Sequence, residues 1–220
     1  MSQSVLEAIR AEGFEPLGWF TPEESDRVPG EAATAILIGN AGPDMFERFA
    51  RERDPARDLM DDWCLGVLGT LARRLGATAH FPFDKPPLPF SLWGRRAKAG
   101  HASPLGLNIH PEFGLWQAYR ALFAFVRPLG LPEREERPSP CVACTAQPCL
   151  HTCPVGAFTP GRYDVERCAG HLATPQGRDC LELGCRARRA CPVGVEYAYS
   201  PSQARFHMSA FARNHVRPTR

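Results

Sequence analysis

Eight of the nine cysteines follow Pro140, and their spacing constrains this chain more than any other feature. They form two arrays that each end in Cys-Pro-Val-Gly: Cys141, Cys144, Cys149 and Cys153, then Cys168, Cys180, Cys185 and Cys191. Thiolates this dense, closed by Cys-Pro, supply the soft anionic sulfurs that a cubane iron–sulfur cluster needs. The arrays therefore predict iron–sulfur clusters and a role in electron transfer.

The spacing also predicts how the cysteines are shared. A two-cluster ferredoxin uses C-x2-C-x2-C-x3-C-P twice, and the fourth cysteine of each run ligates the other cluster. Here the first array reads C-x2-C-x4-C-x3-C-P and the second is looser, which leaves open whether the second cluster is complete. By crossover, we expect one [4Fe–4S] cluster on Cys141, Cys144, Cys149 and Cys191, and the other on Cys153, Cys168, Cys180 and Cys185.

Zinc is the main competing interpretation, because C-x2-C is also a zinc knuckle and two four-cysteine zinc sites would use the same eight sulfurs. His151 and His171 lie near cysteines. We expect neither to be a ligand, since eight thiolates suffice for two cubanes. The remaining cysteine, Cys64, is expected to be a small buried core residue.

The N-terminus carries no apolar segment typical of a signal peptide, and no stretch approaches the roughly 20 apolar residues of a membrane helix. We therefore expect a cytoplasmic protein without a membrane contact. In that compartment clustered cysteines are metal ligands more often than disulfides.

The formal net charge of +2 points to no partner, but the C-terminal end is basic. After residue 182 the chain contains one acidic residue, Glu196, and seven arginines: Arg186, Arg188, Arg189, Arg205, Arg213, Arg217 and Arg220. This end could meet RNA or an acidic protein, or could be a solvated tail. The three arginines before Cys191 could raise the potential of a cluster, or could form a solvated turn.

The layout predicts an α+β domain over residues 1–137 and a ferredoxin-like domain over residues 138–220, joined by the charged, proline-rich stretch 131–140. In the first domain we expect strands over 34–39, 105–110 and 115–125, the last of which could be helical. We expect helices before Gly13, after Pro43 and from Pro55 to about Gly76.

Two segments of the first domain carry candidate functional residues. Asp84 is a lone carboxylate among prolines and phenylalanines, surroundings that favour a proton donor, although a surface role beside Lys85 is equally open. The second segment packs rings, a glycine and a cation together, as a pocket for a flat ligand would, although a half-buried strand also fits. Its candidates are His110, Phe113, Gly114, Trp116 and Arg120.

The chain resembles the epoxyqueuosine reductases and their relatives, the reductive dehalogenases, over roughly residues 80 to 195. The matching elements are the two cysteine arrays and Asp84-Lys-Pro-Pro-Leu88, which is similar to that family's Asp-Ser-Ala-Pro-Leu. The resemblance implies two [4Fe–4S] clusters that pass electrons to a corrinoid, with Asp84 as proton donor.

A second resemblance is to the cobalamin-processing chaperone that removes upper axial ligands. His110-Pro-Glu-Phe-Gly-Leu-Trp-Gln-Ala-Tyr-Arg120 is similar to its His-Pro-x-Phe-Gly-Gly-Trp-Phe-Ala-x-Arg, and residues 42–48 are similar to its Thr-Pro-Ala-Met-Phe-Asp-Arg. Both resemblances imply a nitroreductase-like α+β domain that binds cobalamin. The implied contacts are the five candidates given above: His110, Phe113, Gly114, Trp116 and Arg120.

Three hypotheses follow. The first is an electron-transfer protein that delivers electrons to a corrinoid on its N-terminal domain, supplied by a donor protein or reductase. The second is a non-enzymatic ferredoxin-type carrier whose N-terminal domain docks a partner reductase, so whether the chain is an enzyme stays open. The third is a zinc-stabilised binding module.

Overall fold

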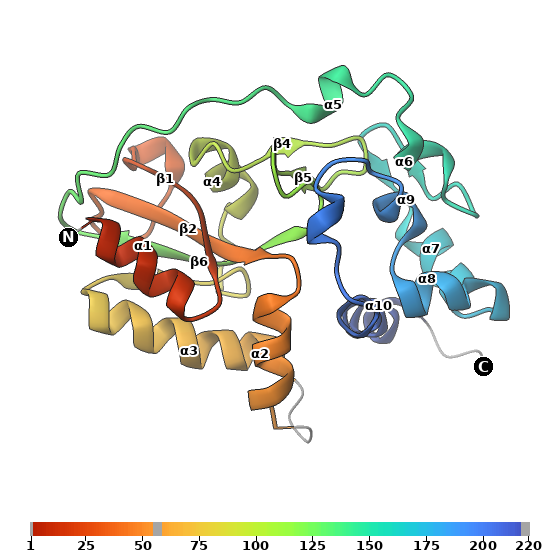
Figure 1. The fold of residues 1–220 in the computed structure, drawn as a ribbon, viewed down its shortest axis with the longest axis horizontal. Coiled ribbons are helices and arrows are strands. Elements are labelled where there is room, and N and C mark those ends of the chain that lie inside the picture. Colours follow the sequence, from red (N-terminus) through yellow and green to blue (C-terminus); the bar gives the residue numbers. More distant parts are fainter. Residues whose placement is uncertain (1, 55–58, 217–220) are drawn as a thin grey trace. The chain divides into compact units, whose positions relative to one another are not determined.

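The computed structural model describes residues 2–54 and 59–216, which form two compact units (Figure 1). The first unit contains the residues up to His101 together with Gln117–Arg137, and the second contains Ala102–Trp116 and Pro138–Arg220. We expected residues 1–137 to form one domain, but the segment 102–116 belongs to the second unit. Helices and strands are mixed, as the α+β prediction requires.

The first unit is built on a four-stranded antiparallel sheet. The strand order is β1 (Glu15–Phe20), β2 (Thr34–Ala41), β6 (Gln117–Phe125) and β3 (Thr78–His80). The expected strand over 34–39 lies within β2, and residues 35–38 of this strand are fully buried. This continuous apolar run is typical of a strand covered on both faces.

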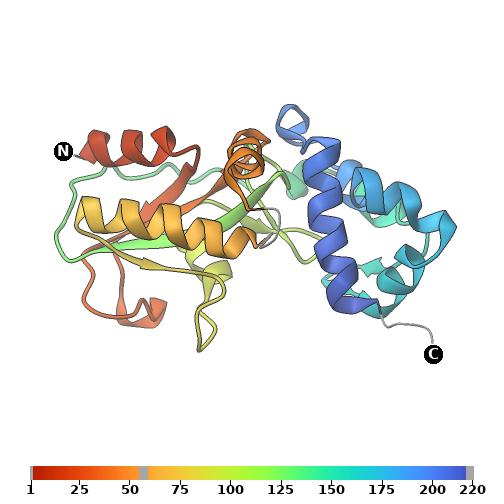
Figure 2. The same ribbon diagram turned by 90° about the horizontal axis from the view of Figure 1, so that it is seen from below.

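Helices α1 (Ser2–Ala11), α2 (Asp44–Glu52), α3 (Met60–Leu75) and α4 (Phe90–Arg96) pack on this sheet (Figures 1 and 2). Acidic residues in the first turn of α3 and arginines in its last turn complement the helix dipole. Gly76 ends the helix at a φ of 71°, as expected for a glycine cap. The expected helix start at Pro55 lies outside the described residues. Cys64 is buried within α3, as predicted.

The proline-rich stretch after β6 has no regular structure, yet it is tied to the first unit. The Trp19 indole donates a hydrogen bond to the Pro132 carbonyl at 2.8 Å, and the Lys98 ammonium donates one to the Arg134 carbonyl at 2.7 Å. The Arg134 guanidinium also lies 4.9 Å from the centre of the Trp19 ring. These contacts order the backbone as far as residue 134, so this part of the expected linker belongs to the packed unit.

The second unit is mainly helical. Its helices are α5 (Pro140–Ala143), α6 (Pro148–His151), α7 (Val165–Leu172), α8 (Arg178–Leu183), α9 (Arg186–Arg189) and α10 (Pro201–His215). Two short hairpins pair β4 (His101–Ala102) with β5 (Asn108–Ile109) and β7 (Phe158–Thr159) with β8 (Arg162–Tyr163). Figure 2 shows α10 as the longest helix of this unit, and it packs on α7 and α8.

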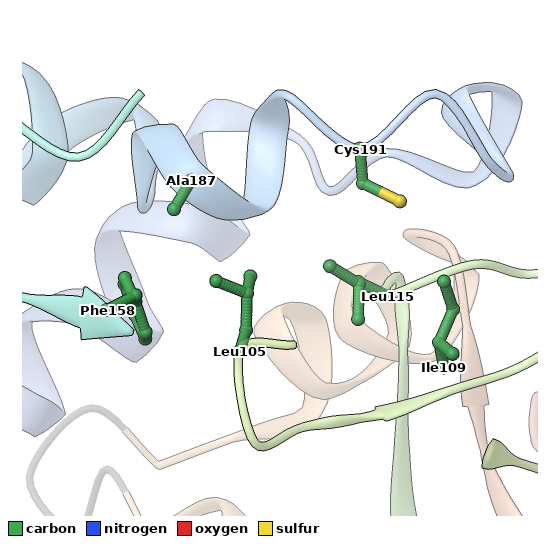
Figure 3. Close-up of a cluster of buried hydrophobic side chains, with 6 residues drawn as sticks. All are labelled: Leu105, Ile109, Leu115, Phe158, Ala187 and Cys191. Atoms are coloured by element: carbon green, nitrogen blue, oxygen red, sulfur yellow. The ribbon is translucent and has the colours of Figure 1, made fainter. Parts of the chain in front are cut away.

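Apolar contacts explain why the segment 102–116 packs with the cysteine arrays. Leu105, Ile109 and Leu115 form one buried cluster with residues 158, 187 and 191 (Figure 3). The expected strand over 105–110 is reduced to β5, because a turn around Gly106, at a φ of 75°, occupies its first half. The expected strand over 115–125 is confirmed from Gln117 onward. Within the described residues, no helix is long and apolar enough to span a membrane.

We predict that Leu37→Ala destabilises the first unit by about 2–5 kcal/mol, because Leu37 is fully buried in a central strand and truncation leaves a cavity. Val126→Ala is the control, since Val126 is 68% exposed and should change stability by less than about 0.5 kcal/mol. Urea denaturation followed by circular dichroism measures both. Equal effects of the two substitutions would contradict this core assignment.

Candidate cluster-binding site

Short helical turns set the positions of the first cysteine array. The Ser139 side chain accepts a hydrogen bond from the Cys141 amide and caps α5, and Cys144 is the residue that follows the end of this helix. Gln147 has a left-handed φ of 39° and leads into α6, which begins at Pro148 and carries Cys149. The two residues that widen this array relative to a ferredoxin thus lie in the turn between the two helices.

The first cavity joins cysteines from both arrays. It is lined by Cys141, Cys144, Cys149 and Cys191, and its space is partly open to solvent. Most of its other lining residues are apolar, and Ile109 and Pro104 come from the segment 102–116. Figure 3 shows the Cys191 side chain pointing toward this segment. The four thiols are those that the crossover pattern assigned to one cluster.

The second cavity also joins both arrays. Its cysteines are Cys153, Cys168, Cys180 and Cys185, and its space is partly open to solvent. Further lining residues are Pro154, Val155, Phe158, His171, Arg186, Ala187 and Met208. Within the part of the chain that the structure describes, no three His, Cys, Asp or Glu side chains form a group that could hold a single metal ion. Each set of thiols instead surrounds a space.

The environment of the thiols favours their neutral form when no metal is bound. Burial raises the pKa of Cys141, Cys149 and Cys191, and neighbouring thiolates of the same cavity raise it further. Burial likewise raises the pKa of Cys168, and it raises the pKa of Cys185 to about 11. Thiolates crowded in this way need a positive charge among them, and an iron cluster or a metal ion supplies it.

Backbone amides stabilise the sulfurs. The Ala157 amide donates to Cys153 Sγ at 3.3 Å, and amides of residues 187 and 188 hydrogen-bond to Cys185. The Val193 amide does the same for Cys191. Such donors favour a negatively charged sulfur, so the donor chemistry of both cavities fits a cubane cluster.

Sequence reasoning did not single out Tyr163. Its hydroxyl donates a hydrogen bond to Cys168 and so lowers the pKa of that thiol, although burial outweighs the effect. The pKa of Tyr163 itself is raised, chiefly by burial. The Tyr163 ring stacks on Phe158 at 4.6 Å between ring centres. The signal in the sequence that could have indicated Tyr163 is the pair of aromatic residues, Phe158 and Tyr163, on either side of a short turn that contains Gly161.

The three arginines before Cys191 have different roles. Arg186 and Arg189 both pair with the Asp179 carboxylate, with an Arg186 Nε to Oδ2 distance of 2.7 Å. Arg188 donates from Nε to the Leu115 carbonyl at 2.9 Å. Its guanidinium also lies 4.9 Å from the ring centre of Trp116 and 4.3 Å from that of Tyr199. Arg188 is therefore not part of a solvated turn.

His110, Phe113 and Gly114 lie in the second unit and form a compact turn. The His110 Nδ1 atom accepts hydrogen bonds from the amides of residues 112 and 113, both at 3.1 Å, and its ring stacks on Phe113. Gly114 has a φ of 58°, and a side chain there would meet the Val193 carbonyl at 2.0 Å. These residues therefore hold the chain that follows Cys191, and a corrinoid contact by them stays a prediction.

Trp116 is packed against the same returning chain. It is buried, and its ring meets Tyr199 edge-on at 5.5 Å between ring centres. Together with Ala204 these two residues form a small core cluster. Trp116→Ala would therefore remove core packing whether or not a ligand contacts the indole.

Arg120 and Asp84 lie in the first unit. Arg120 on β6 donates from Nε to the Asn40 side chain at 2.9 Å, and Asn40 is fully buried. Asp84 is half-buried in the loop between β3 and α4, where its Oδ2 accepts a hydrogen bond from the Phe81 amide at 2.8 Å. The Asp84 amide in turn donates to the Phe81 carbonyl at 3.1 Å, and this reciprocal pair holds the carboxylate in the turn that carries the stacked rings of Phe81 and Phe83.

Solved structures of two kinds share this fold: epoxyqueuosine reductases and a B12-trafficking protein. The epoxyqueuosine reductase of Bacillus subtilis is 16% identical with a TM-score of 0.58, over 90% of this chain and 66% of that one. An epoxyqueuosine reductase solved with an epoxyqueuosine-modified tRNA-Tyr stem loop gives the same values. The C. elegans protein CblC, a human MMACHC homologue, is 15% identical with a TM-score of 0.52, over 99% and 98% of the two chains.

These similarities match the families that the sequence motifs resemble, and they show the fold. The chain spans 66% of the length of the Bacillus subtilis epoxyqueuosine reductase. No protein-family model matches the chain, and no curated protein matches it.

We predict that Gly114→Ala destabilises the second unit by more than about 2 kcal/mol, because the new methyl group would collide with the Val193 carbonyl at a backbone angle that alanine disfavours. Gly170→Ala in α7 is the matched control, with no atom within 4 Å of the new carbon. There we expect a gain of about 0.5–1 kcal/mol from helix propensity. Thermal denaturation of both variants tests the contrast, and a tolerated Gly114→Ala would refute it.

Proposed function

We propose that this chain is an iron–sulfur electron-transfer protein with two [4Fe–4S] clusters, which delivers electrons to a corrinoid and so acts as a reductase. The observation that carries the proposal is the sorting of eight cysteines into two cavities, each lined by cysteines of both arrays. The fold shared with the epoxyqueuosine reductases and CblC supports the corrinoid as electron acceptor.

In this proposal the cysteine thiolates hold the clusters, which accept and release single electrons when bound. The chain's own groups have defined tasks. The amides at residues 157, 187, 188 and 193 stabilise negative charge on the sulfurs, and the apolar walls of the first cavity limit the access of water. A cytoplasmic donor protein or reductase would supply the electrons.

The corrinoid, when bound, would supply a metal centre that accepts these electrons. Among the predicted contacts, Asp84 and Arg120 belong to the first unit, where neither is fully buried. We propose Asp84 as the proton donor, because its loop turn holds the carboxylate beside aromatic rings in one orientation. We propose that Arg120, fixed by Asn40, presents its cation to a polar group of the ligand.

RNA is a further proposed partner. One structural neighbour, an epoxyqueuosine reductase, was solved with a tRNA stem loop. In this chain Arg205 pairs with Glu182 on the exposed surface of the second unit, so part of the basic end is already neutralised. Arg217 and Arg220 lie outside the described residues.

We predict that the anaerobically reconstituted protein binds about eight irons and is brown with a broad visible band, as two [4Fe–4S] clusters require. Cys191→Ser and Cys153→Ser should each remove about four irons, the first from one cavity and the second from the other. The double variant should retain few irons, because the two losses come from separate clusters. Cys64→Ser is the control and should keep all eight.

Iron and sulfide analysis with electron paramagnetic resonance measures these losses. Colourless protein that holds zinc after reconstitution would support the zinc-stabilised module and overturn the proposal. Cys191→Ser and Cys168→Ser removing the same cluster would contradict the crossover, because the two cavities assign these cysteines to different clusters.

We predict that hydroxocobalamin co-elutes with the reconstituted protein on gel filtration, and that dithionite-reduced protein speeds cobalamin reduction relative to dithionite alone. Asp84→Asn should leave co-elution unchanged and lower the rate of any proton-coupled reductive reaction by about 10²–10⁴-fold, the usual contribution of a general acid. Arg120→Gln should weaken co-elution. Two-cluster protein that neither binds a corrinoid nor accelerates its reduction would favour the ferredoxin-type carrier instead.

A further inference from the structure

The second cavity contains a polar side chain that the thiols do not explain. His171 lines this cavity together with the four cysteines, and its Nε2 atom is shielded from solvent. Within the described residues this nitrogen has no hydrogen-bond partner. A buried polar atom without a hydrogen-bond partner destabilises the fold, so its position calls for a partner that occupies the cavity.

Helix α7 carries the side chain of His171 on the same face as the side chain of Cys168. His171 follows Cys168 by three residues on this helix, and residues three apart share one helix face. Ala169 and Leu172 are buried next to this face and fix the rotation of the helix. Arg186, which also lines the cavity, is paired with Asp179.

A cubane cluster has four irons, and each of them needs one protein ligand. The four thiols of this cavity supply all four ligands, so no iron is left for His171 to bind. We infer that His171 donates a hydrogen bond from Nε2 to a sulfur of the second cluster and thereby raises the reduction potential of that cluster alone. This inference rests on the proposed function.

The direction follows from charge. A reduced cluster carries one more negative charge than the oxidised one, so a hydrogen-bond donor to its sulfur stabilises the reduced state more. Tyr163 is already a donor to Cys168 in the same set. His171 would thus be a second side-chain donor to this cluster, acting as a positioning residue without contact to a substrate.

The test is a redox titration of the reconstituted full chain, followed by electron paramagnetic resonance. His171→Phe removes the donor and keeps a flat ring, while His171→Gln restores an N–H donor. At a fixed potential, we expect the ratio of reduced to oxidised second cluster to fall about three- to tenfold in His171→Phe, where tenfold is 59 mV for one electron. His171→Gln should recover most of the ratio, and the first cluster should not change.

His151→Phe is the matched control, because His151 is exposed and lines neither cavity. If His171→Phe fails to fold, the smaller His171→Ala repeats the test. Unchanged potentials in a two-cluster His171 variant would overturn this inference and leave the proposed function intact. The loss of about four irons in both the Phe and Gln variants would overturn it in favour of a ligand. Wild-type protein without clusters would overturn the proposed function as well.

Discussion

The second unit depends on the return of the chain to the first cysteine array at Cys191. This return places one late sulfur among three early ones and so completes the first cavity. The segment 102–116 holds the returning chain in three ways: close packing of Gly114 on Val193, the hydrogen bond from Arg188 to Leu115, and the shared apolar cluster. A segment that precedes the linker in sequence is thus part of the framework around the cysteines.

This arrangement changes the meaning of the aromatic motif between His110 and Trp116. Its rings and its glycine suggest a ligand pocket in the sequence, yet each is engaged by its own unit. His110 organises a turn, and Trp116 lies beneath Arg188 and beside Tyr199. A close packing of backbone on backbone requires the same residue types as a flat ligand does. Sequence alone therefore cannot separate the two roles.

The sequence predicted the parts of the structure that depend on local patterns. The apolar run of β2, the glycine that ends α3 and the buried Cys64 follow from periodicity and conformational preference. The crossover pattern also grouped the cysteines as the two cavities do, while the binding of iron stays a prediction. The placement of 102–116 was missed, because it depends on contacts with residues far along the chain that no local pattern encodes.

The buried His171 nitrogen was missed for a related reason. Its distance from a cysteine in the sequence is visible, but its burial is a property of the folded unit. Arg188 has the same status, since its contact with Trp116 joins segments that are far apart in the sequence. Side chains whose place depends on burial are therefore harder to recognise from the sequence than cysteines in regularly spaced arrays.

The sharing of cysteines between the arrays also determines when the protein can mature during its synthesis. Cys141, Cys144 and Cys149 leave the ribosome before their fourth partner, Cys191, has been translated. At typical elongation rates this interval of roughly 40 residues lasts about 2–8 s. Neither cavity is complete before the second array has been made, so a group that needs all four sulfurs of either cavity can be held only after Cys185 and Cys191 have been translated.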